Sequence, residues 1–529
     1  AYLNQLMVLI DGVPVATPLF AGTWWALQDV DLGEVDRIEI VRGPGGILWG
    51  ANAVHGVVHV ITKPAAESQG LATSAVVSPN ERHQTFRGGV PFGETGSLRV
   101  GGKWSSYDSN RNPWFGLDQS WGIRSGTLRA DWGEEGERSS TAWGRFYEAT
   151  IGADGFDVIA FETIGVTDVA HGFQAYYTTT NAEGDEHITA WVSQDVQDLE
   201  TELDLDILVA DLEYRRDFAT GDSGQLSAGI GYRHVDAELL GDDPFWMTFD
   251  PEHRELHTLR AFAVQTWDLL DDDLSLVLGA QAEHNNLTEF ELQPTVRVSW
   301  HPQADYTLWA SATRSVRTPS LEEVGLASGS YTVGNPDFKS ENVRSYELGC
   351  RWQVDQRTGL DLAMFHNDYD DLQVEEFDPA TFEYVFQNGG EGSSDGFELA
   401  IDSKPTETWN LRSAYSYIRG THEAKVGGFD LGTDEYHPKH QFNIRSYHDL
   451  ADDLELDLGL YLVEGMGDAF EDAERTRLDM RLGWNPRPGV EAFVGLQRIG
   501  STSQTEFGAF DEPRAQVLFG VTLTANTAR

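Results

Sequence analysis

Regular alternation of apolar and polar side chains runs through most of this 529-residue chain and limits its possible folds more than any other feature. In residues 454–463 leucine occupies every second position, and residues 226–232, 274–280 and 517–523 repeat the alternation. A period of two residues is typical of a β-strand with one apolar face. A soluble sandwich could contain some such strands, but so many over so long a stretch favour a barrel.

Hydropathy narrows the class of barrel. The sequence contains no run of about 18 apolar residues, which excludes a helical membrane protein. A mean hydropathy of -0.38 is compatible with a membrane barrel, because alternate residues of each strand face a polar lumen. Aromatic residues make up 11% of the chain and glycines number 54, which suits interfacial girdles and tight turns. We therefore predict an all-β fold, a transmembrane antiparallel β-barrel.

Short polar turns between the alternating segments allow the strands to be counted. Candidate turns lie near Gly93, Gly133, Asp168, Gly221, Asp271, Pro302, Gln356, Pro405, Asp452 and Pro486. Ten turns on one rim separate eleven hairpins, so we predict about 22 strands. Short turns should face the periplasm and longer connections the outside. The expected outer segments are 234–257, 314–345, 366–395, 418–440 and 498–513.

The chain is strongly acidic, with a formal charge of -49 and a pI of about 4.4. This charge argues against a nucleic-acid partner, because phosphates would be repelled. Two explanations of the acidity remain open. Acidic loops could face salty water in a salt-adapted organism, or the charge could form a funnel that attracts cationic or metal-bearing ligands.

Signatures of an enzyme or of a resident metal are weak. The sequence has no Gly-x-Ser-x-Gly elbow, and its single cysteine, Cys350, falls on a predicted lipid face and allows no internal disulfide. His253, Glu255 and His257 would share one face of a strand, as metal ligands can, but no defined fourth ligand accompanies them. We interpret them as solvated loop residues, and we expect no catalytic residues, no cofactor and no metal site.

Several ordered motifs resemble the TonB-dependent outer-membrane receptors. Four of these motifs resemble parts of the family's plug: Leu9-Ile10-Asp11-Gly12, Arg37-Ile38-Glu39, Arg42-Gly43-Pro44, and the stretch from Trp49-Gly50-Ala51-Asn52-Ala53 to Ile61-Thr62-Lys63. Two further segments, residues 311–323 and 334–349, resemble parts of the family's barrel. The resemblance implies a plug domain in residues 1–67 and a 22-stranded barrel with a plugged lumen in residues 68–529.

The resemblance also implies a location and partners. We expect a bacterial outer-membrane protein that contacts outer-membrane lipid, a TonB-type energy-coupling protein, and a small-molecule or metal-chelate ligand. The sequence begins in the middle of a plug, so the first half of the plug and the TonB box are expected upstream of Ala1 or supplied elsewhere. The given sequence ends on Arg529 and not on the terminal aromatic residue common in such barrels, so we expect Phe519 and the strand around it to supply that signal.

One set of site residues follows from the family. There an arginine of the plug's Arg-Gly-Pro motif meets glutamates on the barrel wall, which carries over to Arg42 with Glu347 and Glu398. Alternation supports the assignment, because each glutamate stands between residues of an apolar face and should point into the lumen. A lumenal carboxylate can pair with an inserted arginine. The alternative is that both glutamates merely line a watery wall.

Candidate substrate contacts come from aromatic residues. Phe20, Trp24 and Trp25 lie in a plug loop that rises toward the outside in the family, and Phe245 and Trp246 lie in an expected outer loop. They could form an aromatic surface for a ligand. The plug aromatics could equally pack against the barrel wall.

The leading functional hypothesis is TonB-dependent import of a scarce solute across the outer membrane. The solute would be a metal chelate such as a siderophore, or a vitamin-like compound. Two alternatives stay open: a passive porin-like channel narrowed by a half-plug, and a scaffold barrel that transports nothing.

Overall fold

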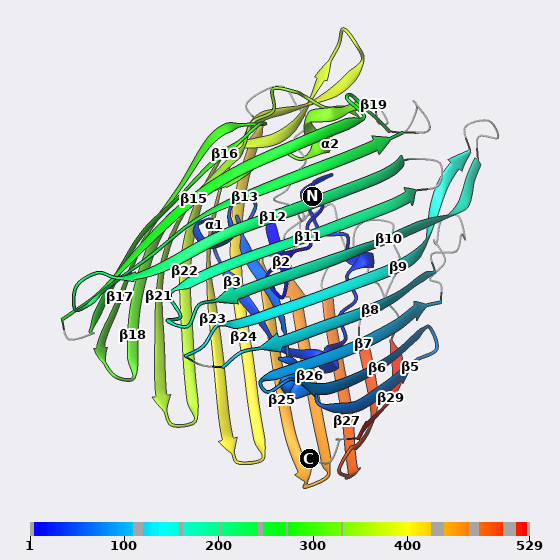
Figure 1. Cartoon of the computed structure of the whole chain (residues 1–529), viewed down its shortest axis with the longest axis vertical. Helices are drawn as coiled ribbons and strands as arrows, with labels where there is room; N and C mark the ends of the chain where they lie inside the picture. Colours follow the sequence, from blue (N-terminus) through cyan, green and yellow to red (C-terminus); the bar gives the residue numbers. More distant parts are fainter. Residues whose placement is uncertain are drawn as a thin grey trace.

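In the computed structural model, the N-terminal segment forms a small sheet inside a closed barrel built by the rest of the chain (Figure 1). The barrel has 22 antiparallel strands, which confirms the predicted fold class and strand number. The structure describes residues 5–108, 120–134, 136–157, 162–199, 203–241, 247–270, 273–328, 332–424, 438–464, 475–500 and 515–525. None of the helices in these residues has the length and apolar character of a membrane-spanning helix.

The inner sheet has four strands in the order β2-β1-β4-β3. Their bounds are β1 Leu6–Ile10, β2 Val13–Pro14, β3 Val35–Arg42 and β4 Gly56–Thr62. Short helical turns join or follow them: η1 Trp25–Leu27, η2 Leu32–Glu34, α1 Gly46–Trp49 and η3 Ala65–Ser68. Strand β1 is almost wholly buried and pairs in parallel with β4, as its continuous apolar run requires. We call residues 5–68 the plug.

The barrel strands follow one another around the wall in chain order, and β29 closes the barrel against β5. Their bounds are β5 Gly70–Val77, β6 Glu81–Phe92, β7 Gly96–Tyr107, β8 Trp121–Trp132, β9 Ser139–Asp157, β10 Glu162–Thr180, β11 Glu186–Leu199, β12 Leu203–Ala219, β13 Gly224–Leu240, β15 His253–Leu269, β16 Leu274–Asn285, β17 Glu289–Gln303, β18 Tyr306–Arg317, β21 Glu341–Asp355, β22 Thr358–Asp378, β23 Glu383–Thr406, β24 Trp409–Ala424, β25 His440–Ala451, β26 Leu454–Glu464, β27 Arg475–Arg487, β28 Val490–Gly500 and β29 Gln516–Ala525. The connections hold four shorter elements: β14 Thr248–Phe249, α2 Leu321–Gly325, β19 Leu326–Ser328 and β20 Thr332–Val333.

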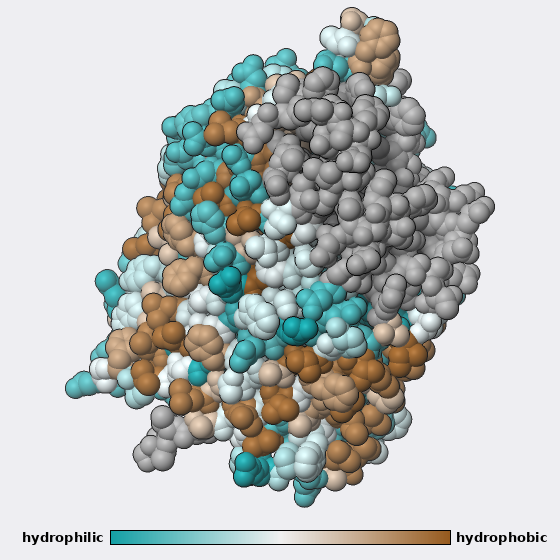
Figure 2. Space-filling view, turned by 90° about the vertical axis from the view of Figure 1, so that its right-hand side faces the viewer, coloured by the Kyte–Doolittle hydropathy of each residue, from teal (hydrophilic) through white to brown (hydrophobic). Residues whose placement is uncertain are grey.

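Apolar side chains alternate outward along the wall and form a band around it. Tyr346 and Leu348 are 49% and 57% exposed on the outer face of β21, whereas Glu347 between them turns inward to Ser311. Figure 2 shows such apolar residues gathered over the lower part of the face that it presents. So much exposed apolar surface on a closed barrel is covered by lipid.

Ten connections of two to six residues lie at one end of the barrel, which we call the short-turn rim. Nine fall at or within a few residues of the predicted turns. The prediction at Asp168 was wrong, because this residue lies within β10 and pairs with Ile151. Its polar side chain alternates with outward-facing Val169, so it marks the wet face of a long strand and not a turn.

The missed turn spans residues 181–185. The Asn181 side-chain oxygen accepts hydrogen bonds from the backbone N–H groups of Asp185 and Glu186, each at 3.1 Å. Gly184 adopts a φ of +78°, which favours glycine. Asn and Gly are ordinary turn residues, so the signal was present in the sequence.

The opposite end, which we call the long-loop rim, contains the 318–340 connection. The expected outer segment 366–395 proved to be strand, because β22 and β23 continue as a hairpin that projects past their neighbours (Figure 1). The expected 234–257 segment narrows to residues 241–252 for the same reason. Beyond the lipid both faces of a strand contact water, so a polar sequence there does not mark the end of the strand. Residues 425–437 and 501–513 of the other expected segments lie outside the described residues.

A large apolar cluster fills the lumen toward the long-loop rim. It joins plug residues to the wall and to α2, and its members are Val13, Leu19, Trp143, Trp191, Leu203, Leu205, Ile207, Val209, Val235, Ala237, Leu239, Phe249, Leu321, Val324, Leu326, Phe338 and Phe386. We call it the lumenal cluster. At the start of β12 the apolar residues therefore face inward, and Asp204 and Asp206 face outward, the reverse of the lipid band.

Candidate functional site

Arg42, the last residue of β3, reaches the inner wall of β22 and β23. Its Nη1 donates to Oε2 of Glu398, and its Nη2 lies 3.3 Å from Oδ1 of Asp361. The Arg42 and Glu398 side chains are 46% and 31% exposed, so water reaches the pair. An ion pair as wet as this contributes no more than about 1 kcal/mol. The contact between plug and wall at Arg42 can therefore open at low cost.

Glu347 contacts the turn beside Arg42. Its carboxylate occupies the space that a side chain at residue 43 would need, and it accepts a hydrogen bond from Ser311 Oγ at 2.8 Å. Gly43 also has a φ of +74°, so both the backbone and the close approach of Glu347 require glycine there. The structure thus brings Arg42, Glu347 and Glu398 to one place, with Arg42 paired to Glu398.

Asp361 was not predicted from the sequence as a partner of Arg42. It shares its carboxylate between Arg42 and Arg351, whose Nε donates to Oδ2 at 3.0 Å. Leu360 and Leu362 flank it on the lipid-facing side of β22. The alternation that places Glu398 in the lumen would have placed Asp361 there too.

Asp11 explains why two motifs of the plug occur together. Its carboxylate accepts hydrogen bonds from the backbone N–H and the hydroxyl of Thr62, both at 2.7 Å, although the two residues are 51 positions apart. Arg129 of β8 approaches the same carboxylate to 3.6 Å. Asp11 therefore fastens the end of β4 and ties the plug to the wall.

A buried ion cluster centres on Arg317 at the end of β18. Arg317 is 1% exposed; its Nε donates to Glu341 at 2.6 Å, and its two terminal nitrogens donate to Glu323 at 2.8 and 2.6 Å. Glu323 also completes a capping box with Ser320 at the start of α2. Gln5 of the plug donates to Glu341 at 2.9 Å. The cluster folds the 318–340 connection down onto the plug, and sequence reasoning assigned it no role.

Helix α2 contacts the plug loop directly. The N–H groups of Leu321 and Glu322 donate to the carbonyls of Pro18 and Leu19 at 3.0 and 2.9 Å. Burial, together with the nearby charges of Glu323 and Glu375, raises the pKa of Glu322 to about 7. The protonated form of Glu322 is therefore favoured where α2 meets the plug.

The aromatic residues of the plug loop divide into two groups. Phe20 and Trp24 meet edge to face with ring centroids 5.2 Å apart and pack against the lumenal cluster. Trp25 is 52% exposed. Phe20 and Trp24 thus pack inside the barrel, and Trp25 lies at the surface. Phe245 and Trp246 lie outside the described residues.

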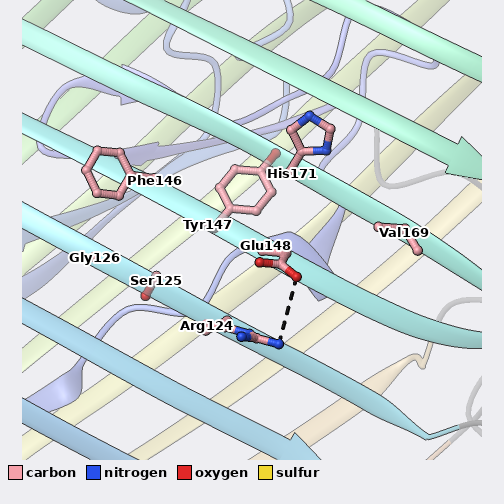
Figure 3. A pocket seen from close by; sticks show the side chains of 8 residues that line it. All are labelled: Arg124, Ser125, Gly126, Phe146, Tyr147, Glu148, Val169 and His171. Carbon is pink, nitrogen blue, oxygen red and sulfur yellow. Dashed lines mark ion pairs between the residues drawn. The ribbon is translucent and has the colours of Figure 1, made fainter.

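A recess of about 660 Å³ lies on the wall at strands β8, β9 and β10 (Figure 3). Arg124, Glu148 and His171 form a row across these three strands, with Arg124 Nη2 3.8 Å from Glu148 Oε1. Phe146 beside them is 64% exposed on the outer face. An exposed pair of this length contributes little energy, and the recess belongs to the outward-facing surface of the barrel.

Family comparison accounts for both parts of the chain. The family TonB dependent receptor-like, beta-barrel matches residues 69–497, and the TonB-dependent Receptor Plug Domain matches residues 2–57. The chain is 25% identical over 390 residues to the vitamin B12 transporter BtuB of Vibrio vulnificus, covering 70% of this chain and 60% of the relative. It is 26% identical over 450 residues to the iron-regulated outer membrane virulence protein of Vibrio cholerae, covering 78% and 66%. The match thus spans less than two thirds of either relative.

Solved structures share the fold. The ferric enterobactin receptor PfeA of Pseudomonas aeruginosa superposes with a TM-score of 0.80 at 15% identity, covering 99% of this chain and 92% of that one. The siderophore receptor PirA of Acinetobacter baumannii gives a TM-score of 0.79 at 15% identity, covering 99% and 91%. Together with the family match over most of its length, the plugged barrel assigns this chain to the TonB-dependent receptors of the bacterial outer membrane.

Proposed function

We propose that this protein imports a scarce solute across the outer membrane, driven by a TonB-type energy-coupling protein. The solute is a metal chelate of the siderophore type or a vitamin-like compound, in line with the names of the relatives. The observation that carries the proposal is a plug that occupies the lumen and meets the wall at Arg42 through water-exposed ion pairs. Import in this scheme changes no covalent bond.

The surface of the plug along β3 supports the same mechanism. Ile38 and Ile40 are 51% and 68% exposed, so the wall does not cover this edge of the plug sheet. Arg42 ends the same strand and holds it to β22 and β23. We propose that release of Arg42 from Glu398 and Asp361 lets this edge shift and opens a path beside it.

Uptake in cells tests the import proposal. The protein is expressed in a strain that lacks its own siderophore and vitamin B12 receptors, with and without the TonB-type protein. Labelled ferric catecholate chelates and cobalamin are then supplied. We expect accumulation of one of them only in energised cells with the coupling protein. Equal accumulation without that protein would contradict the proposal and favour a passive channel.

Conductance in planar bilayers separates the sealed receptor from a porin. A plug held by Arg42 and the lumenal cluster should leave the purified protein nearly silent. Large steady openings in the unmodified protein would favour a passive channel instead. Normal silence combined with no uptake of any solute would favour a scaffold.

We further propose Trp25 as a contact for the imported solute, because it is the exposed member of the plug-loop aromatics. Phe20 and Trp24 would shape the surface behind it. Trp25→Ala should weaken binding of the solute found by uptake about tenfold, as expected for an aromatic contact in a binding site. Trp49→Ala, inside the plug, serves as a matched control for loss of a tryptophan.

A further inference from the structure

We propose that the outer face of β13 and β15 carries a binding site for a divalent cation of the zinc and copper class, formed by His234, Glu255 and His257. The register of the two strands places His234 directly opposite His257, and Glu255 is two positions along the same face. One ligand atom from each residue lies within 4.8 Å of the others. The sequence alone suggested a loop here, and it did not connect His234 with the other two.

The three side chains face outward, away from the plug. Glu255 and His257 are 51% and 45% exposed, whereas Ala237, opposite Arg254, is fully buried on the inner face. The next outward pair toward the short-turn rim is Tyr232 with Leu259, 46% and 48% exposed, which belongs to the apolar band. The site therefore lies one step beyond the lipid-covered surface, where a cation can reach it from water.

The spacing suits a transition metal. The Nδ1 atoms of His234 and His257 are 3.3 Å apart. Glu255 contacts the other ring nitrogen of His257, with 3.4 Å between Oε2 and Nε2, and one atom of each residue lies within 4.8 Å of the others. Two imidazole nitrogens bound tetrahedrally at zinc distances lie about 3.3 Å apart. Two imidazoles and one carboxylate favour zinc or copper over magnesium or calcium, which prefer oxygen ligands. The remaining coordination positions would hold water.

Negative charge around the histidines gives a second, independent reason to expect a cation. Asp236 lies directly opposite Glu255, and like charges opposite one another in a sheet are destabilising. Between His234 and Leu259 the sequence has one lysine or arginine, Arg254, and its guanidinium donates to the Asp250 carbonyl at 3.3 Å. A cation at Glu255 would offset the repulsion.

The neighbouring groups hold the site in place. His253 pairs with Asp236 at 2.8 Å, so that carboxylate has a partner of its own and Glu255 is left to His257. The backbone N–H of His257 donates to the Asn286 side chain at 2.9 Å, which ties β15 to the connection that follows β16. The two histidines thus sit on paired strands of a closed barrel. To share an ion, the side chains rotate and His257 Nδ1 gives up its contact with the Tyr232 hydroxyl, now at 2.8 Å.

Zinc titration of the purified barrel tests the proposal. The protein is prepared in detergent without a histidine tag and titrated with Zn²⁺ against a fluorescent chelator. We expect the unmodified protein to bind one more zinc ion than His257→Gln or His234→Gln, or to bind it at least about tenfold more tightly, because even outer-sphere partners of a metal carry that much affinity. Co²⁺ should give the visible absorption of a tetrahedral site, which both variants lose.

His171→Gln is the matched control. His171 also faces outward from a barrel strand beside a carboxylate, Glu148, but Arg124 supplies the positive charge there (Figure 3). This variant should bind zinc like the unmodified protein. Heat-dependent mobility on SDS gels shows that each variant is a closed barrel; if a histidine variant does not close, Glu255→Gln takes its place.

Two outcomes would overturn the proposal. In the first, the His234 and His257 variants retain the zinc affinity and the Co²⁺ spectrum of the unmodified protein. In the second, Ca²⁺ displaces zinc at equal concentration, which would indicate a nonspecific acidic surface. The site lies outside the lumen, so either outcome leaves the import proposal untouched.

Discussion

Two of the regions in which the plug meets the barrel wall differ in chemistry. Toward the long-loop rim, Val13 and Leu19 are buried in the lumenal cluster. At the end of β3, Arg42 reaches Glu398 and Asp361 through side chains that water still contacts. Burying apolar surface stabilises by about 25 cal/mol per Å², whereas a wet ion pair contributes about 1 kcal/mol at most. The apolar region should therefore anchor the plug, and the charged region should yield first.

The comparison changes the expectation drawn from sequence. The family resemblance implied a charge contact between the plug and the wall at Arg42. The structure adds an apolar anchor that the sequence did not indicate, because inward-facing Leu203, Leu205 and Ile207 have the same alternation as a lipid-facing strand. Four predictions break or sharpen the contrast between the two regions.

The largest effect is expected for Arg317→Ala, which leaves Glu323 and Glu341 buried without their partner. Removing one side of a buried ion pair costs about 3–5 kcal/mol. The 318–340 connection should then lift from the plug, seen as faster hydrogen exchange at the Val324 amide, which donates to Ser320. Arg344→Ala, which breaks an exposed pair with Asp370, is the control and should leave that exchange unchanged.

Ile207→Ala tests the apolar anchor. Ile207 is 1% exposed in the lumenal cluster, and truncating a buried isoleucine costs about 2–4 kcal/mol. We expect a lower guanidinium midpoint for unfolding in detergent micelles. Leu450→Ala, at a residue 54% exposed near the short-turn rim, should shift the midpoint much less. Equal shifts would mean that the lumenal cluster does not anchor the plug.

A change of pH should act where α2 meets the plug. The pKa of Glu322 is raised to about 7, above its ordinary value of 4.5, so the docked state favours the protonated carboxyl. This contribution is complete below about pH 4.5 and is lost as the pH rises through about 7, an effect on the order of 2 kcal/mol. Protease cleavage in the 318–340 connection should therefore be faster at pH 8 than at pH 5. Glu322→Gln should remove the difference, and a difference that persists would assign it to another group.

Periodicity and turn residues were sufficient for most of the barrel. Alternation does not depend on distant contacts, so it can be read directly, and Gly or Asp at the short-turn rim marks where strands reverse. The same reasoning failed at Asp168, because a lumenal polar residue and a turn residue look alike when β10 continues beyond the lipid.

Part of the contact between plug and wall could be predicted from the sequence. Alternation put Glu347 and Glu398 in the lumen, and the family resemblance matched them to Arg42; alternation would also have found Asp361. The cluster of Arg317, Glu323 and Glu341 could not be predicted from the sequence, because it forms only when a connection without periodicity folds back over the plug. Nothing local in the sequence indicates that fold.

The smallest effect is expected at Arg42, and it decides whether the charged region can open first. In a double-mutant cycle, Arg42→Ala and Glu398→Ala should show a coupling of about 0.2–1 kcal/mol, because both side chains are wet. The coupling should shrink between 0.1 M and 1 M salt, as the screening length falls from about 10 Å to about 3 Å. The measured quantity is the urea concentration at which bilayer conductance appears, which reports displacement of the plug.

The matched pair is Arg99 with Glu34, also between wall and plug, 2.8 Å apart and only 6% and 12% exposed. Its coupling should be larger and less sensitive to salt, since water screens it less. The order of the two couplings carries the argument. If Arg42 and Glu398 proved as strongly coupled and as indifferent to salt as Arg99 and Glu34, the charged region would be an anchor too, and movement of the plug would have to begin elsewhere.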